Sequence, residues 1–191
     1  NFQGEKLPCH TVVGFRHGFP KAPYRNTTFG LKQILSLFPK ADWYCYLEPD
    51  VLVASDEFKQ ELTNEFWCAG NNHRIGKMKI PFVEKMIGRN IEKSHYLLGC
   101  CVFYHRDFLM TLNRLKFFDR FLEITQVFEK GFYPEYQGYD LTEHLYPSLA
   151  VALGGRVGQL ACWKENRWVG SQIYPMRWRP ELEDIYEEGS L

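Results

Sequence analysis

The stretch that most constrains the fold is an apolar run that ends on two acidic residues. Residues 43–47 read Trp-Tyr-Cys-Tyr-Leu without polar alternation, which predicts a short strand covered on both faces, as in a parallel or mixed sheet. Glu48, Pro49 and Asp50 follow directly. Because proline ends a strand and holds the preceding residue out of the helical region, we expect both acids on an extended corner at the strand's carboxyl end.

That corner is a predicted metal site. Open α/β sheets bind their ligands at the carboxyl ends of strands, and two carboxylates spaced in this way can share one hard divalent cation, which can in turn hold a diphosphate. We therefore expect Glu48 and Asp50 to be metal ligands. The alternative is a plain acidic turn, since Asp and Pro are common turn formers.

The segments before the run predict a parallel strand–helix–strand unit. Residues 10–15 are β-branched and aromatic, which favours a strand, and residues 28–38 carry apolar side chains at helical spacing. Together with the strand at 43–47 they form the order expected of a right-handed parallel crossover. This unit would leave Glu48 and Asp50 at its carboxyl end.

The loop between the first predicted strand and helix, residues 16–25, contains a group of basic side chains. Arg16, Lys21 and Arg25 lie in it, among glycine and proline residues. A basic loop that follows a strand is a candidate phosphate-binding segment, whereas a solvated surface loop is the alternative.

The second half of the chain predicts further strands and helices. Residues 96–104 form an apolar strand that contains Gly99 and Cys100, and a glycine within a strand often marks the close approach of a ligand or another backbone. Further helices are predicted at 55–66, 106–121 and 140–153, and a last strand at 156–163. Asp140 and Glu143 open the helix at 140–153, where they form a capping box unless they serve chemistry.

Composition narrows the class of protein. The 191 residues fit one domain, and the formal net charge is zero, from 23 basic and 23 acidic residues, which argues against a general nucleic-acid binder. There is no run of about 18 apolar residues that would span a membrane. The six cysteines have no metal-ligand spacing, so we expect reduced thiols and a soluble cytoplasmic protein, compatible with peripheral association with a membrane.

The order of these motifs resembles the nucleotide-sugar glycosyltransferases of the GT-A fold, in particular glycosyltransferase family 2. The matching segments are Tyr46 to Asp50 for an Asp-x-Asp-like corner, Tyr96 to Cys100 for a donor-sugar strand, Asp140 to Val157 for an acid-opened helix that ends at Gly154-Gly155, and Tyr174 to Arg177 for a C-terminal segment. The resemblance spans roughly residues 10–178.

The resemblance implies a fold and a set of site residues. The fold would be α/β, a GT-A-like, Rossmann-related, mixed and mostly parallel sheet flanked by helices, in one domain over 1–191 whose tail, 163–191, covers the cleft. The implied roles are Mn²⁺ or Mg²⁺ binding by Glu48 and Asp50, donor binding by Arg16, Lys21, Arg25, Gly99, Cys100 and Arg177, and catalysis by Glu143 or Asp140 as the base.

Three features depart from the family's pattern. The first acid is Glu48 and not Asp, Tyr174 stands where a metal-binding His can occur, and the family's first strand with its Asp-bearing turn is not evident before His10. For the last departure three explanations are open: the chain is shortened relative to the family, a nucleotide-binding segment precedes the given sequence, or the base is held differently.

We therefore predict a metal-assisted enzyme that transfers a sugar from a nucleotide-diphosphate sugar to a hydroxyl of a glycan, lipid or protein acceptor. Two alternatives remain open at this point: a glycosyltransferase-like domain that binds a nucleotide sugar or glycan without turning it over, and a nucleotidyltransferase, which would need a better glycine-rich loop than Gly14 to Gly18.

Overall fold

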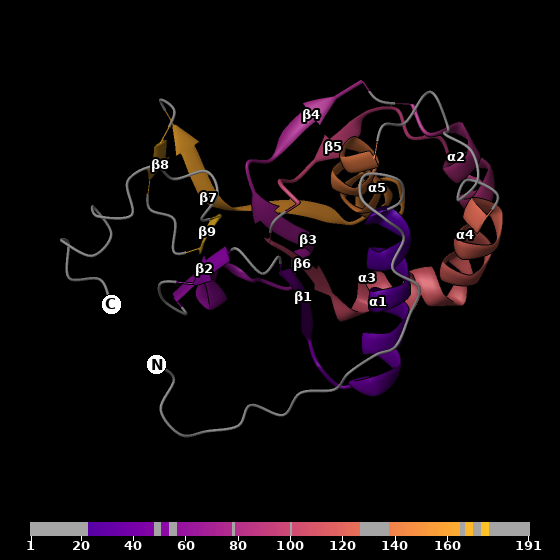
Figure 1. Cartoon of the computed structure of the whole chain (residues 1–191), viewed down its shortest axis with the longest axis horizontal. Coiled ribbons are helices and arrows are strands. Elements are labelled where there is room, and N and C mark those ends of the chain that lie inside the picture. The colour runs from indigo at the N-terminus through magenta and orange to yellow at the C-terminus, as the bar shows by residue number, and fades with distance from the viewer. Residues whose placement is uncertain are drawn as a thin grey trace.

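The computed structural model describes residues 23–47, 51–53, 57–77, 79–99, 101–126, 138–164, 167–169 and 173–175 (Figure 1). Within these residues the chain is a mixed α/β protein. Its α-helices are α1 (Pro23–Leu37), α2 (Pro81–Ile87), α3 (Arg106–Arg114), α4 (Phe117–Gln126) and α5 (Gly138–Ala152), with a 3₁₀ turn at Glu57–Glu61. Its strands are β1 (Trp43–Leu47), β2 (Val51–Val53), β3 (Phe66–Asn71), β4 (Arg74–Gly76), β5 (Ser94–Tyr96), β6 (Cys101–His105), β7 (Arg156–Lys164), β8 (Arg167–Val169) and β9 (Ile173–Pro175).

The main sheet has the strand order β1-β6-β3-β7-β8. Strand β6 is antiparallel to both of its neighbours, β1 and β3, whereas β3 and β7 are parallel. Beyond its pairing with β3, β7 continues into a hairpin with β8. Two smaller antiparallel pairs, β2–β9 and β4–β5, complete the strands of the described residues.

The prediction of a mostly parallel sheet is therefore wrong in its strand directions, although the mixed α/β class is confirmed. The apolar run at 43–47 was expected to be covered on both faces, but it forms β1, an edge strand in which only Tyr44 is buried and Cys45 and Leu47 are exposed. The strand that is covered on both faces is β6, all five residues of which are buried. An unbroken apolar run does not distinguish an edge strand from a central one, nor parallel from antiparallel neighbours.

Several element boundaries also differ from the predictions. Helix α1 begins at Pro23, five residues before the predicted start, and Pro is well suited to the first helical position. The single helix predicted at 106–121 is two helices, separated by Leu115 and by Lys116, which has a φ of 54°. The predicted strand at 96–104 is divided into β5 and β6, and within the predicted helix at 55–66 the structure has a 3₁₀ turn of five residues, Glu57–Glu61.

The predicted helix and strand near the end of the chain are confirmed as α5 and β7. Helix α5 is buried from Leu145 to Ala150, and it packs beside α1 and β5. Figure 1 shows α1, α3, α4 and α5 gathered beside the sheet, whereas β2, β8 and β9 lie at its other end. A hydrogen bond of 2.6 Å from the Tyr146 hydroxyl to Thr28 Oγ1 joins α5 to α1 inside this core.

The cysteines that the structure describes agree with the expected reduced state. Cys45, Cys68 and Cys101 carry free thiols, and Cys68 and Cys101 are buried in apolar surroundings. In the described part of the chain, no helix combines the length and the apolar character needed to cross a membrane.

Candidate functional site

Three strands of the main sheet end at one edge. Because β1 and β3 are both antiparallel to β6, they run in the same direction as each other, and β7 runs parallel to β3. Their carboxyl ends therefore meet at the edge where β6 begins. Leu47, the last residue of β1, pairs with Cys101, the first residue of β6. We call this the site edge, defined by Leu47, Asn71, Gly99 and Cys101.

Glu143 reaches the site edge from helix α5. Its Oε1 accepts a hydrogen bond of 2.9 Å from the backbone N–H of Gly99, and its carbonyl oxygen accepts one of 3.1 Å from Leu97 N–H. The segment 97–99 is thus bound to one residue of α5 through both a side chain and the backbone. Two of the residues predicted for the site, Gly99 and Glu143, are in direct contact.

The missing side chain of Gly99 makes this contact possible. A Cβ atom at position 99 would lie 3.0 Å from Glu143 Cγ and 3.1 Å from its Oε1, closer than most real Cβ contacts. The sequence prediction was that Gly99 leaves room for a donor sugar. In the structure, the space beside Gly99 is used by the Glu143 side chain.

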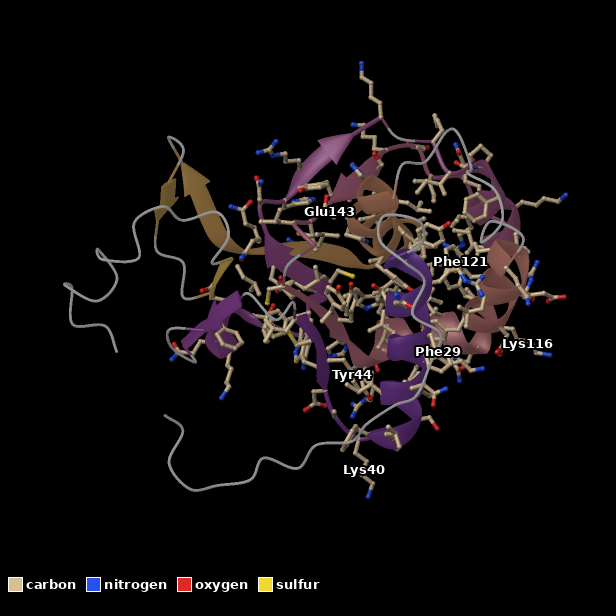
Figure 2. The ribbon with its side chains drawn as sticks, viewed as in Figure 1. Phe29, Lys40, Tyr44, Lys116, Phe121 and Glu143 are labelled. Carbon is tan, nitrogen blue, oxygen red and sulfur yellow. The ribbon has the colours of Figure 1, made fainter. Side chains whose placement is uncertain are left out.

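His144, the next residue of α5, packs against Gly76 in the same way. A Cβ atom at Gly76 would lie 3.2 Å from His144 Cε1 and 2.8 Å from Ser94 Oγ, and the rings of Tyr96 and His144 lie 5.2 Å apart. The backbone N–H of His95 also donates to Ser148 Oγ at 2.8 Å. The β4–β5 hairpin and the segment 97–99 therefore fix the start of α5 at the site edge, where Figure 2 shows Glu143 beside the hairpin.

The capping box predicted for Asp140 and Glu143 is not formed as expected. Helix α5 begins at Gly138, so Asp140 lies within the first turn and not at the N-cap position. The Glu143 carboxylate is bound to Gly99 N–H, which lies on another segment of the chain. Asp140 still lies where the helix dipole favours a negative charge, but its side chain is outside the described residues.

Arg25 does not lie in a loop at the site. It belongs to the first turn of α1, is 8% exposed, and donates from Nη1 to Leu122 O and to Thr125 Oγ1, both at 2.6 Å. These bonds join α1 to α4 in the core, so the assignment of Arg25 to phosphate binding is corrected to a structural role. The sequence misled here because Gly18, Pro20 and Pro23 were interpreted as loop residues, whereas Pro23 begins the helix.

The remaining predicted residues lie outside the described residues: Arg16, Lys21, Glu48, Asp50, Cys100 and Arg177. Leu47 lies at the site edge, one residue before Glu48, and Val51 pairs with Pro175, two residues before Arg177. The acidic corner and the C-terminal segment are thus flanked by strands that pair with each other.

The two predicted metal ligands, Glu48 and Asp50, lie outside the described residues. Among the residues that the structure describes, no group of three or more His, Cys, Asp or Glu side chains is placed to hold a metal ion. The oxygen donors of the predicted pair, Glu48 and Asp50, suit a hard cation such as Mg²⁺ or Mn²⁺.

A cavity lies at the other end of α5 and is distinct from the site edge. Its volume is about 360 Å³, and it is lined by residues 90–93, His95, Ser148, Val151 and Ala152. Helix geometry separates Val151 from Glu143 by about 12 Å along the axis of α5. The cavity therefore does not include Glu143, and it contributes no residue to the predicted site.

One pair of side chains close to the site edge was not predicted. His73 Nε2 and His95 Nδ1 lie 3.0 Å apart. The ring centroids are 5.3 Å apart and the ring planes differ by 11°, so the rings meet edge to edge in one plane, as in an N–H···N hydrogen bond. Burial lowers the pKa of both histidines, and the neighbouring His73 and Lys93 lower the pKa of His95 further. Two histidines 22 residues apart give no sequence signal of such a pair.

In comparisons with known proteins, no family model, curated protein or solved structure matches the chain.

Proposed function

We propose that the chain belongs to a metal-assisted glycosyltransferase of the GT-A type, which transfers a sugar from a nucleotide-diphosphate sugar to an acceptor hydroxyl. The observation that carries this proposal is the meeting of three predicted segments at one sheet edge. The end of β1 leads into Glu48, the start of β6 follows Gly99, and Glu143 is hydrogen-bonded to Gly99. These segments are far apart in the sequence, and a site for one donor requires them together.

Each segment has a distinct part in the proposed reaction. Glu48 and Asp50 would hold Mn²⁺ or Mg²⁺, which supplies Lewis-acid stabilisation of the leaving diphosphate. Arg177, Arg16 and Lys21 are the remaining candidates to bind the diphosphate oxygens by charge.

Glu143 is the proposed general base. The backbone N–H of Gly99 donates to Oε1, and a hydrogen bond of this kind favours the charged form of a carboxylate, which is the form that accepts a proton. A carboxylate has two oxygens and accepts several hydrogen bonds, so the bond to Gly99 is compatible with abstraction of the acceptor's hydroxyl proton. The same bond fixes the orientation of the side chain, which a general base requires.

The contact between Glu143 and Gly99 also favours one alternative. A carboxylate that holds a backbone segment in place can be purely structural, and the chain would then be a domain that binds a nucleotide sugar or glycan without turnover. The two functions differ in whether the bound donor is cleaved.

The test is donor cleavage with and without metal. The full chain is incubated with a panel of nucleotide-diphosphate sugars, with Mn²⁺ or with a chelator, and release of the nucleoside diphosphate is measured beside donor binding by calorimetry. We expect Mn²⁺-dependent release that Asp50→Asn abolishes with an unchanged melting temperature. Glu123→Gln, a change of an exposed acid on α4, is the matched control and should retain full activity. Binding without release would support the non-catalytic domain, and neither binding nor release would contradict both.

A further inference from the structure

The β4–β5 hairpin presents one face away from α5. Ile75 pairs with His95 across the hairpin, and the neighbouring pair, Gly76 and Ser94, faces α5, because a Cβ atom at Gly76 would lie 3.2 Å from His144 Cε1. Side chains alternate between the two faces of a strand, so Ile75 and His95 point to the opposite side. Ile75 is 61% exposed, more than any other large apolar side chain of the described residues.

Two lysines lie on the same side of the hairpin as Ile75. Lys77 and Lys93 are both exposed. Lys77 follows Gly76 and Lys93 precedes Ser94, so by the same alternation both side chains point away from α5, at the end of the ladder. We call Ile75, Lys77 and Lys93 the hairpin face.

The charge of this region is unusual for the chain. Residues 73–93 contain six Lys and Arg and two Glu, a net charge of +4 in a chain whose total is zero. Of the two acids, Glu84 is half-buried and its Oε1 accepts a hydrogen bond of 2.7 Å from Ile91 N–H, whereas Glu92 is exposed. The excess positive charge is therefore exposed, with one acid beside Lys93.

We propose that the hairpin face binds the surface of an anionic lipid bilayer. Lysine and arginine side chains near such a surface are attracted by its negative potential, and an exposed aliphatic side chain among them can enter the boundary between headgroups and acyl chains. The hairpin brings both features together: Ile75 is the apolar residue, and Lys77 and Lys93 are the basic residues on the same face.

The combination favours a bilayer over a soluble polyanion. A nucleic acid or an acidic glycan would use the basic side chains, but it offers no apolar phase in which Ile75 loses its contact with water. The exposure of Ile75 is thus accounted for by a lipid partner and by no other polyanion.

The experiment is sedimentation of the full chain with vesicles of phosphatidylcholine, with and without phosphatidylserine, at low salt. We expect binding to the vesicles that contain phosphatidylserine and none to pure phosphatidylcholine. Each basic side chain near an anionic surface contributes about fivefold to the partition coefficient, so Lys77→Gln/Lys93→Gln should weaken binding about 30-fold.

Two further variants complete the test, each checked for native circular dichroism. Lys40→Gln/Lys116→Gln removes the same charge from exposed positions that Figure 2 shows well away from the hairpin, and it should change binding less than twofold. Ile75→Ser should weaken vesicle binding and leave binding to heparin, a soluble polyanion, unchanged. The proposal is overturned if phosphatidylserine vesicles do not bind, if the control pair loses as much as the hairpin pair, or if Ile75→Ser has no effect on vesicle binding. Vesicle binding is measured without a nucleotide sugar, so its outcome does not depend on whether the chain catalyses the proposed sugar transfer.

Discussion

Glu143 and Gly99 are joined by a hydrogen bond of 2.9 Å that links helix α5 to the segment before β6. The carbonyl oxygen of the same glutamate accepts from Leu97 N–H. The side chain of Glu143 lies where a Cβ atom of residue 99 would point. The absence of a side chain at position 99 and the position of the carboxylate therefore depend on each other.

Gly99→Ala should displace the Glu143 side chain, because the new Cβ would lie 3.0 Å from Glu143 Cγ. We expect a loss of about 1–2 kcal/mol in the free energy of unfolding, the low end for an inserted methyl group since a glutamate side chain can retreat. Urea unfolding measures this change in the free energy of unfolding. Gly30→Ala is the matched control: Gly30 is exposed in α1 and a Cβ atom there meets nothing within 4 Å, so the change should stabilise by about 0.5–1 kcal/mol. Equal stability of Gly99→Ala and the wild type would contradict the close contact.

Glu143→Gln separates chemistry from structure at the same residue. Glutamine keeps an oxygen that can accept from Gly99 N–H, so the free energy of unfolding should fall by less than about 1.5 kcal/mol, the net value of one hydrogen bond. If Glu143 is the proposed base, the transfer rate should fall about 10²–10⁴-fold, since the amide cannot take a proton. The rate of donor cleavage at saturating donor is the measurement. A normal rate in a folded Glu143→Gln protein would leave Glu143 a structural residue only.

Gly99 and Glu143 illustrate which part of the candidate site could be predicted from the sequence. Both residues were selected from local patterns, a glycine inside an apolar run and an acid at a helix start, and the structure brings them together. The reason for their contact was not foreseen, because nothing in a local pattern reports that a helix 44 residues further along the chain supplies the atoms beside Gly99.

Strand direction and helix starts were the weaker predictions for physical reasons. The apolar run of β1 is compatible with either direction of its neighbour, and only the register from Trp43↔His105 to Leu47↔Cys101 identifies β6 as antiparallel to it. Arg25 was placed in a loop because Gly18, Pro20 and Pro23 are frequent in turns, yet Pro is also favoured at the first position of a helix. The partners that decide between these interpretations, Leu122 and Thr125, lie about 100 residues away.

Arg25→Met tests the structural role of this arginine. The change removes two hydrogen bonds to α4 and leaves Thr125, which is fully buried, without one donor. We expect a loss of about 2–4 kcal/mol, because bonds to a charged donor are worth about 1.5–3 kcal/mol each and are not additive. Arg25→Lys, which can keep one of the bonds, should lose less. A melting temperature equal to that of the wild type, together with weaker donor binding, would restore Arg25 as a ligand of the phosphates.

The last prediction concerns pH and the pair formed by His73 and His95. The pKa of each is lowered from 6.5, mainly by burial, so the folded protein binds these protons more weakly than the unfolded chain does. Above pH 6.5 both imidazoles are neutral in either state, and the contribution of the pair to stability is fully present. As the pH falls below 6.5, the unfolded chain gains protons first, so the free energy of unfolding decreases until the folded pKa values are reached.

Protonation also replaces the N–H···N bond at 3.0 Å with two facing donors. The decrease amounts to about 1.4 kcal/mol for each unit by which the pKa is lowered, and urea unfolding from neutral pH to about pH 5 measures it. In His73→Gln/His95→Gln neither residue titrates, so the decrease over this range should be smaller than in the wild type. If the double variant loses as much stability as the wild type between the same pH values, the acid sensitivity comes from other groups and the pair does not titrate as its burial indicates.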